Sequence, residues 1–200
     1  MTTMPQLSQA IKTCTNCVLS ETRTQAVVGS GPVPATLMII GEGPGAQEDA
    51  QGKPFVGRSG QLLTKMLAAI QINRDTDVYI TNIVKCRPPN NRAPHATEVA
   101  QCRTYLEQQL ALIQPKLLIT LGAPALKTLL GETQPISQVR GNWYKLPVDY
   151  MTEPLYSMPL FHPSYLLRND SKEKGSPKWL TWNDLNEIKT AYQLYKSESA

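Results

Sequence analysis

The stretch Leu37–Asp49, LMIIGEGPGAQED, determines how the rest of the chain is interpreted. Four consecutive apolar residues at 37–40 predict a buried strand. Residues 41–45, GEGPG, then predict a tight loop in which backbone amides can approach a ligand closely. Ligands of open α/β sheets bind at the carboxyl ends of the strands, so this loop is a candidate site.

Glu42 sets this loop apart from the common glycine-rich loops. Its carboxylate would repel a phosphate, and the spacings of the dinucleotide fingerprint and of the P-loop are both missing. A carboxylate at the end of a strand suggests a site that handles water or an electron-poor centre. The alternative is a tight turn without chemistry.

Length and charge place broad limits on the protein. Its 200 residues suit a single domain spanning 1–200, with 41% apolar residues. The net charge of +4 allows a polyanionic partner without requiring one. Residues 51–100 hold seven basic residues against three acidic ones, which makes the middle segment the basic part of the chain.

The chain shows no signal for secretion or membrane insertion. Its first residues lack a basic region followed by an apolar run, and no apolar run approaches the ~18 residues that a membrane helix needs. We therefore expect a soluble, intracellular, cytoplasmic protein. Structural disulfides are not expected in that compartment.

Four cysteines then need another explanation. Cys14 and Cys17 form a Cys-x-x-Cys pair, while Cys86 and Cys102 come from distant parts of the chain. A pair with this spacing is a common half-site for zinc or for an iron–sulfur cluster, and spacing does not separate the two. Unrelated buried cysteines or a redox pair are the alternatives.

Strands and helices alternate along the chain. This order predicts an α/β sandwich around a mainly parallel sheet. Apolar runs indicate strands at 37–40, 78–84, 116–122 and 155–161 (broken by Pro159), with another within 137–144. Helical patterns indicate a helix around the first cysteine pair at 5–20, one capped by Ser59, and others at 97–113, 124–130 and 183–196.

The predicted strand ends bring together a short set of polar groups. Glu42 and Gly43 follow one strand, Asn82 ends the next and His162 follows another, with Phe55 in a nearby loop. An aromatic face, an amide and an imidazole suit a planar heterocycle with carbonyl and imide edges. If that heterocycle is a leaving group, the imidazole can stabilise the charge that builds on it. With a basic surface, a nucleobase in DNA becomes the natural substrate.

Several segments together resemble the family 4 uracil-DNA glycosylases. They are GEGPGAQED, GKPFVGRSGQLL, TNIVKCRPPNNRAP, LGAPALKTLL and HPSYLLRN, and the resemblance covers residues 8–195. It implies a three-layer α/β/α sandwich with a central four-stranded, mainly parallel sheet. It also implies excision of uracil from DNA in base excision repair, by hydrolysis of the N-glycosidic bond. The cysteines resemble the family's ligand set for a [4Fe–4S] cluster.

The resemblance also implies roles for individual residues of the pocket. The uracil pocket falls on Gly41, Glu42 and Gly43, with Phe55 stacking on the base and Asn82 reading its polar edge. Two further residues complete it: His162 would donate to O2, and Glu48 would lie near the C5 edge as a barrier to thymine's methyl group. Superfamily relatives carry Asp or Asn where Gly43 stands, so Glu42 is expected to orient the water.

The segment HPSYLLRN suits extrusion of the base from the duplex. As a loop, its turn at Ser164 would compress the backbone, and Tyr165, Leu166 or Leu167 would fill the vacated stack. The cations expected to hold phosphates are Lys85, Arg87 and Arg168, unless they form only a solvated basic rim.

Two other functions are compatible with parts of the sequence. One is a DNA-binding module with a structural cluster and no catalysis, against which Glu42, Asn82 and His162 argue. The other is a relative that stays covalently attached to its DNA and carries a basic, histidine-containing insertion after a PPNN-type segment. Residues 88–98, PPNNRAPHATE, hold a single His95 and no such insertion. We therefore expect a monomer that acts on uracil-containing DNA, single- or double-stranded.

Overall fold

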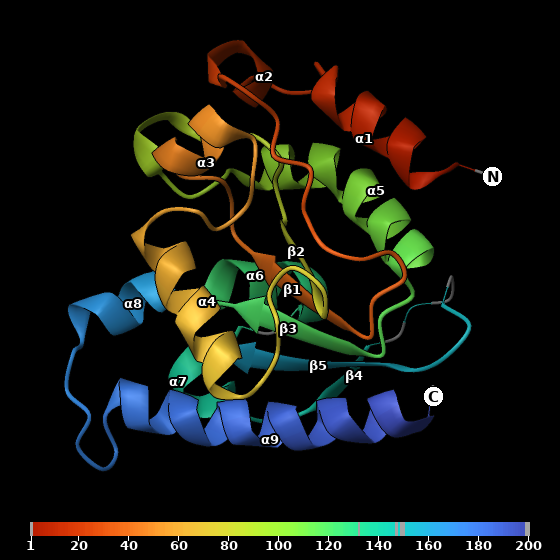
Figure 1. Cartoon of the computed structure of the whole chain (residues 1–200). Coiled ribbons are helices and arrows are strands. Elements are labelled where there is room, and N and C mark those ends of the chain that lie inside the picture. Colours follow the sequence, from red (N-terminus) through yellow and green to blue (C-terminus); the bar gives the residue numbers. More distant parts are fainter. Residues whose placement is uncertain (1, 132, 147, 149–150, 199–200) are drawn as a thin grey trace.

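The fold is built on one five-stranded sheet (Figure 1). The computed structural model describes residues 2–131, 133–146, 148 and 151–198. Strands run in the spatial order β2-β1-β3-β5-β4, and all pair in parallel except β4, which is antiparallel to β5. Their bounds are β1 Leu37–Gly41, β2 Val78–Asn82, β3 Leu117–Leu121, β4 Tyr144–Leu146 and β5 Leu155–Leu160.

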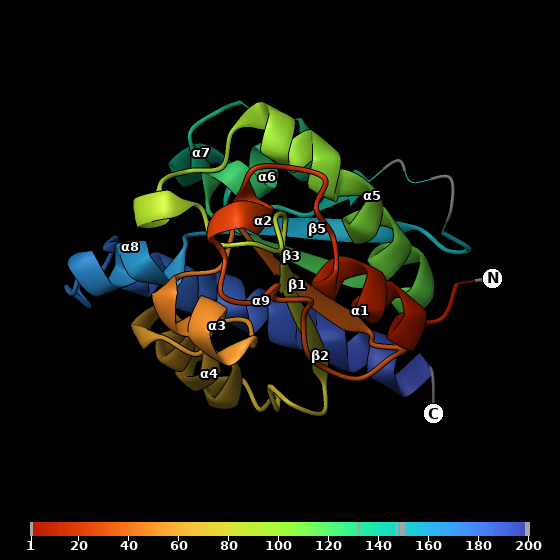
Figure 2. The ribbon, with the colours of Figure 1, turned by 90° about the horizontal axis from the view of Figure 1, so that it is seen from above.

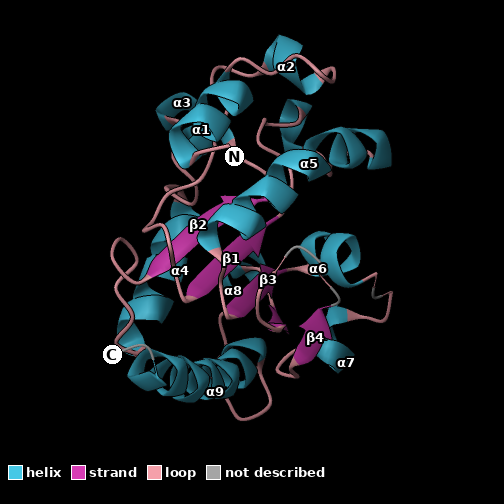
Figure 3. Cartoon of the chain, turned by 90° about the vertical axis from the view of Figure 1, so that its right-hand side faces the viewer, coloured by secondary structure: helices cyan, strands magenta, loops and turns pink. Residues whose placement is uncertain are grey.

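Helices cover both faces of the sheet and make it the middle of three layers (Figure 3). In the part of the chain that the structure describes, no helix has the length and apolarity needed to cross a membrane. The helices are α1 Met4–Lys12, α2 Leu19–Thr22, α3 Ala46–Gln51, α4 Arg58–Ala69, α5 Ala96–Ile113, α6 Ala123–Leu130, α7 Ile136–Val139, α8 Pro163–Arg168 and α9 Pro177–Glu198, with a 3₁₀ turn at Pro89–Asn91.

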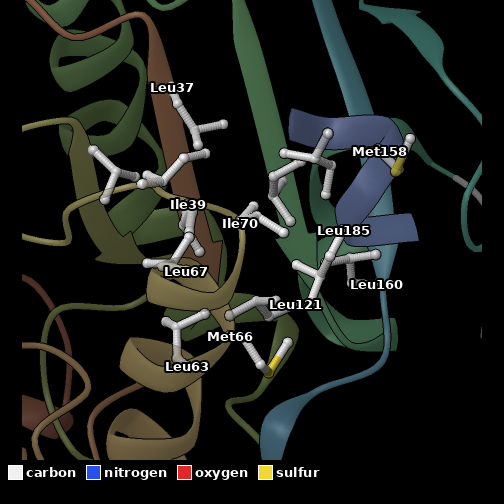
Figure 4. Packing of buried hydrophobic residues seen from close by; sticks show 14 of the residues in the cluster. Leu37, Ile39, Leu63, Met66, Leu67, Ile70, Leu121, Met158, Leu160 and Leu185 are labelled. Atoms are coloured by element: carbon white, nitrogen blue, oxygen red, sulfur yellow. The ribbon is translucent and has the colours of Figure 1, made fainter. Parts of the chain in front are cut away.

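Strand β1 shows why its apolar run is continuous. All five of its residues are buried, because helices pack on both faces. Leu37 and Ile39 face a core formed with α4 and α9 (Figure 4). Met38 and Ile40 face a second core formed with α1, α5 and α6, and Figure 2 shows α1 beside α5 in that layer. The side chains of one strand thus alternate between the two cores.

The mainly parallel α/β sandwich is confirmed, and several details differ, among them residues 13–18, which interrupt the helix expected at 5–20. The sheet has five strands instead of four, because β4 adds an antiparallel edge. The strand expected within 137–144 begins only at Tyr144, since 136–139 forms α7. Ser59 does not cap α4, because Gly57 holds that position. The segment 162–169 is mainly helix α8, since Pro163 suits the first turn of a helix and His162 caps it.

Pro159 does not break β5. It pairs with Thr120 of β3 in the parallel ladder. Its carbonyl accepts from the backbone N–H of Gly141 (3.1 Å), so its backbone polar edge faces away from β3. Strand β4 pairs only with residues 155–157, and the missing N–H of proline therefore costs no ladder bond.

A buried ion pair joins the segment after α7 to α9. Arg140 donates to Asp184 through Nε (2.6 Å) and Nη2, and to the Leu180 carbonyl (2.9 Å). The Asp184 side chain is 5% exposed and the Arg140 side chain 12%. Removing one member of such a pair leaves an uncompensated buried charge.

Asp184→Ala is therefore expected to lower the free energy of unfolding by about 3–5 kcal/mol. Urea denaturation followed by circular dichroism measures this loss. Glu107→Ala is the matched control, because it breaks the exposed pair between Arg103 and Glu107, which is worth about 0.5 kcal/mol. Equal, small losses in both variants would contradict the role given to the buried pair.

Candidate active site

The centre of the site is the close approach of β1 and β2 at their carboxyl ends. Gly41 pairs with Asn82 in the parallel ladder. A Cβ atom at Gly41 would lie 2.5 Å from Asn82 Oδ1 and 2.5 Å from Phe55 Cζ. Only glycine fits there, and its missing side chain lets the amide and the aromatic ring meet.

A cavity of about 150 Å³ opens beside this contact. Seven residues line this cavity. Five of them were predicted for a binding pocket: Gly43, Glu48, Phe55, Asn82 and His162. The other two, Gly45 and Ser59, were not predicted.

Asn82 carries the polar recognition group of the cavity. Its side chain is 1% exposed, and its Oδ1 is buried without a hydrogen-bond partner among the described residues. A buried amide oxygen in this state costs free energy unless something donates to it. A ligand N–H in the cavity would supply that donor.

His162 faces Phe55 across the cavity, with the ring centroids 5.9 Å apart. Nδ1 of His162 accepts from the backbone N–H of Ser164 (3.1 Å) at the start of α8. Because Nδ1 is an acceptor, the neutral ring carries its hydrogen on Nε2. Burial, helped by the nearby charge of Arg168, lowers the pKa of His162 to about 4. The imidazole is therefore a neutral donor at neutral pH.

Glu42 lies in a second cavity, of about 380 Å³, which also contains His162. The two cavities share His162, whereas Asn82 lines only the first and Glu42 only the second. Burial raises the pKa of the Glu42 carboxyl, which makes its carboxylate a stronger base. The structure thus separates a recognition cavity from a neighbouring cavity that holds the carboxylate.

The four cysteines line another cavity, of about 20 Å³, formed by α5 and the turn between α1 and α2. All four are free thiols. Arg23 donates to Cys86 Sγ (3.0 Å) and to the Cys14 carbonyl (2.8 Å). Among the residues described, no three His, Cys, Asp or Glu side chains converge as ligands of a single metal ion. The thiols therefore share one cavity without meeting at one point.

Comparison with known proteins assigns the fold to a family. The model for the uracil DNA glycosylase superfamily matches residues 28–186. The chain belongs to that superfamily. It is 47% identical over 171 residues to the type-4 uracil-DNA glycosylase of Thermotoga maritima, which covers 85% of this chain and 86% of the relative. It is 40% identical to the type-4 enzyme of Archaeoglobus fulgidus, over 84% of each chain.

A type-5 relative matches less of the chain. The type-5 uracil-DNA glycosylase of Pyrobaculum aerophilum is 34% identical over 114 residues, half of each protein. The type-4 enzyme of the same organism is 42% identical over 169 residues, 82% of this chain. Within the superfamily, the type-4 relatives therefore resemble this chain over much more of its length.

Two of the predicted DNA contacts of this superfamily member are wrong. Lys85 is 1% exposed, and its Nζ donates to Thr81 Oγ1, the Asn82 carbonyl and Gln109 Oε1 at 2.6–2.8 Å, so it cannot reach a phosphate. Leu166 is 2% exposed and belongs to the core under α8, so it cannot enter a base stack.

Of the remaining predicted contacts, Ser164, Tyr165 and Arg168 line the cavity of Glu42. Tyr165 is exposed on α8, Leu167 is half-buried and Arg168 is exposed. Ser164 is occupied at the His162 ring, with its Oγ 2.8 Å from Nδ1. Arg87 is half-buried and donates to Asn91 Oδ1 (2.9 Å). Contact of these residues with DNA therefore stays a prediction.

Sequence reasoning missed Arg74, which contacts the Phe55 loop. In the sequence, Arg74 is only one of the seven basic residues of the segment 51–100. In the structure its guanidinium donates to the carbonyls of Pro54 and Phe55. No motif marks such a residue, because the loop that it binds lies about twenty positions earlier in the chain.

The depressed pKa of His162 has a measurable consequence. We expect its ring to titrate with a midpoint near pH 4 in NMR spectra of the folded protein. The unfolded chain binds a proton near pH 6.5, about the ordinary value for histidine. The stabilising contribution of neutral His162 is therefore complete above about pH 6.5 and falls as the pH drops towards about 4. A midpoint near 6.5 in the folded protein would contradict the burial argument.

Proposed function

We propose that this protein is a uracil-DNA glycosylase of base excision repair, which hydrolyses the N-glycosidic bond of deoxyuridine and leaves an abasic site. It acts in this proposal as a monomer on single- or double-stranded DNA. The observation that carries the proposal is the buried, unpartnered Oδ1 of Asn82 beside Phe55 and His162 in one cavity. The type-4 relatives support it by name.

Each of the three side chains would recognise a different part of uracil. The ring of Phe55 offers a face for stacking. The amide of Asn82 can accept from N3–H and donate to O4, a pattern that cytosine does not match. Nε2–H of His162 can donate to O2. A site with buried polar groups rejects a mismatched edge strongly, which would separate uracil from cytosine.

The same arrangement would lower the barrier to bond cleavage. When the C1′–N1 bond breaks, its electron pair moves onto uracil and positive charge builds on the sugar. A neutral His162 stabilises the uracil anion at O2 without protonating it, and one such donor is typically worth ~10²–10³ in rate. Water adds to C1′ and gives up a proton. The raised pKa of Glu42 suits it to orient that water and accept the proton.

DNA would have to present the base outside the stack. Tyr165, which is exposed on α8, and the half-buried Leu167 would fill the space that the base leaves. Arg168 lines the cavity of Glu42, where the sugar and its phosphates would lie. Extrusion would then be driven from the same helix whose start holds the catalytic imidazole.

We infer a [4Fe–4S] cluster as the cofactor held by Cys14, Cys17, Cys86 and Cys102. Each iron of such a cluster takes one thiolate, and the four thiols that line one cavity would supply the four that it needs. When bound, the cluster would supply a covalent tie between the amino terminus and α5.

The charge around the thiols supports the same inference. Lys85 is a fully buried cation whose three hydrogen-bond partners are all neutral. Burial lowers its pKa to about 8, and the thiols of Cys102 and Cys86 are the charges that oppose this shift. A buried cation needs a nearby anion. Thiolates around a cluster would provide it, and Arg23 would add a hydrogen bond to Cys86.

Release of free uracil from uracil-containing oligonucleotides tests the function. Asn82→Ala removes both hydrogen bonds to the base edge and is expected to slow release roughly hundredfold, since each bond is worth about 1–3 kcal/mol. Asn82→Asp, with its carboxyl protonated, is expected to begin accepting cytosine. Asn186→Ala, an exposed amide on α9, is the matched control. Tight DNA binding without any uracil release would identify a non-catalytic binding module instead.

Anaerobic purification tests the cofactor. The protein is expected to be brown, with one cluster per chain by iron and sulfide analysis, and Cys86→Ser is expected to lose the colour and melt at a lower temperature. A colourless protein with one stoichiometric zinc would overturn the inference. The readout does not depend on catalysis, so it is separate from the uracil assay.

A further inference from the structure

The backbone of Phe55 is held in an unusual conformation. Its φ angle is +51°, in the left-handed region that bulky side chains rarely adopt. The side chain is nevertheless 6% exposed and forms one wall of the recognition cavity. A non-glycine residue in this region costs on the order of 1–3 kcal/mol, so the surroundings must hold it there.

Arg74 binds the carbonyl side of the loop. Its Nη1 donates to the Phe55 carbonyl (2.6 Å), and its Nη2 donates to the carbonyl of Pro54. Thr64 Oγ1 accepts from Nη1 (2.9 Å) and so fixes the guanidinium against α4. One side chain thus engages two consecutive carbonyls, for which the fork of donors in arginine is well suited.

Glu48 binds the amide side of the same loop. Its Oε1 accepts from the backbone N–H groups of Val56 and Gly57, both at 2.8 Å. Its Oε2 accepts from the N–H of Gly45 (3.2 Å) in the glycine loop. The carboxylate therefore ties the Phe55 loop to the glycine loop at the end of β1. Both oxygens are occupied by the backbone, and the predicted contact of Glu48 with the C5 edge stays a prediction.

The start of α4 leaves the loop little room to relax. A Cβ atom at Gly60 would lie 1.9 Å from the Phe55 carbonyl oxygen. The loop therefore packs directly on the helix backbone, and the same carbonyl is the acceptor of Arg74. Four successive residues, 54–57, have either a carbonyl or an amide bound by a charged side chain.

We propose that Arg74 is a positioning residue for base recognition: together with Glu48 it holds Phe55 in its left-handed conformation and so fixes the plane on which the extruded base stacks. This inference rests on the proposed function. Without the guanidinium, the carbonyls of Pro54 and Phe55 lose their donors. The backbone of Phe55 then relaxes to negative φ, and its ring leaves the position beside Gly41 and His162.

The test compares Arg74→Met with Lys65→Met, which removes a cation from an exposed position on neighbouring α4. Arg74→Met is expected to raise the inhibition constant of free uracil about tenfold, the loss typical of one base–aromatic stack. Affinity for a duplex with an abasic site, which has no base to stack, is expected to stay within about twofold of wild type. Lys65→Met is expected to change neither quantity.

A double-mutant cycle shows whether Arg74 acts through Phe55. If it does, Arg74→Met adds almost nothing to the loss already caused by Phe55→Ala. Additive losses overturn the proposal, and so does an equal loss of affinity for abasic DNA, which would make Arg74 a DNA contact. Should Arg74→Met fail to fold, Thr64→Val serves instead, because it removes one contact that holds the guanidinium against α4 while the charge remains; a smaller loss of the same pattern is then expected.

Hydrogen exchange separates this inference from the proposed function. The amides of Val56 and Gly57 are expected to exchange faster in Arg74→Met than in wild type, whatever the substrate. Faster exchange in a protein that releases no uracil would refute the proposed glycosylase function and support the positioning of Phe55 by Arg74. Unchanged exchange and unchanged uracil inhibition in an active enzyme would refute that positioning role and leave the glycosylase function standing.

Discussion

The site depends on the absence of a side chain at Gly41. The parallel register places Gly41 opposite Asn82, and any β-carbon there would overlap both the amide and the ring of Phe55. The amide proposed to read the edge of a base and the ring proposed to stack on its face therefore meet at one backbone position. His162 completes the cavity from β5, across the ring of Phe55. A larger residue at position 41 would separate these functions even if every polar side chain remained.

Three basic side chains serve the interior instead of the DNA. Lys85 lies in the core, Arg74 binds loop carbonyls and Arg140 pairs with Asp184. Arg168 is left as an exposed cation beside the cavities. The charge count of the middle segment therefore overstates the DNA-binding surface, because a guanidinium or ammonium with several backbone acceptors is as useful for holding loops as for holding phosphates.

The sequence predicted the strands and the residues at their ends, and it failed where the chain turns away from a strand. An apolar run such as 37–40 identifies a buried strand, and parallel strands bring Asn82 and His162 to one edge. The directions of the side chains that come after a strand end are not determined by the alignment of parallel strands. Lys85 turns into the core three positions after Asn82, and Leu166 falls on the inner face of a helix that Pro163 begins. Contacts between distant segments decide these directions.

Burial of the paired cavities sets the protonation of both groups that the chemistry needs. Desolvation disfavours charge, so it lowers the pKa of His162 to about 4 and raises that of Glu42 above its ordinary value. The two shifts bring the ordinary titration ranges of the carboxyl and the imidazole closer together. Near neutral pH the imidazole is uncharged and cannot neutralise the carboxylate. In the proposed reaction, the carboxylate of Glu42 would then be available for the water and the cationic sugar, while the leaving base would meet an N–H donor that does not have to give up its proton.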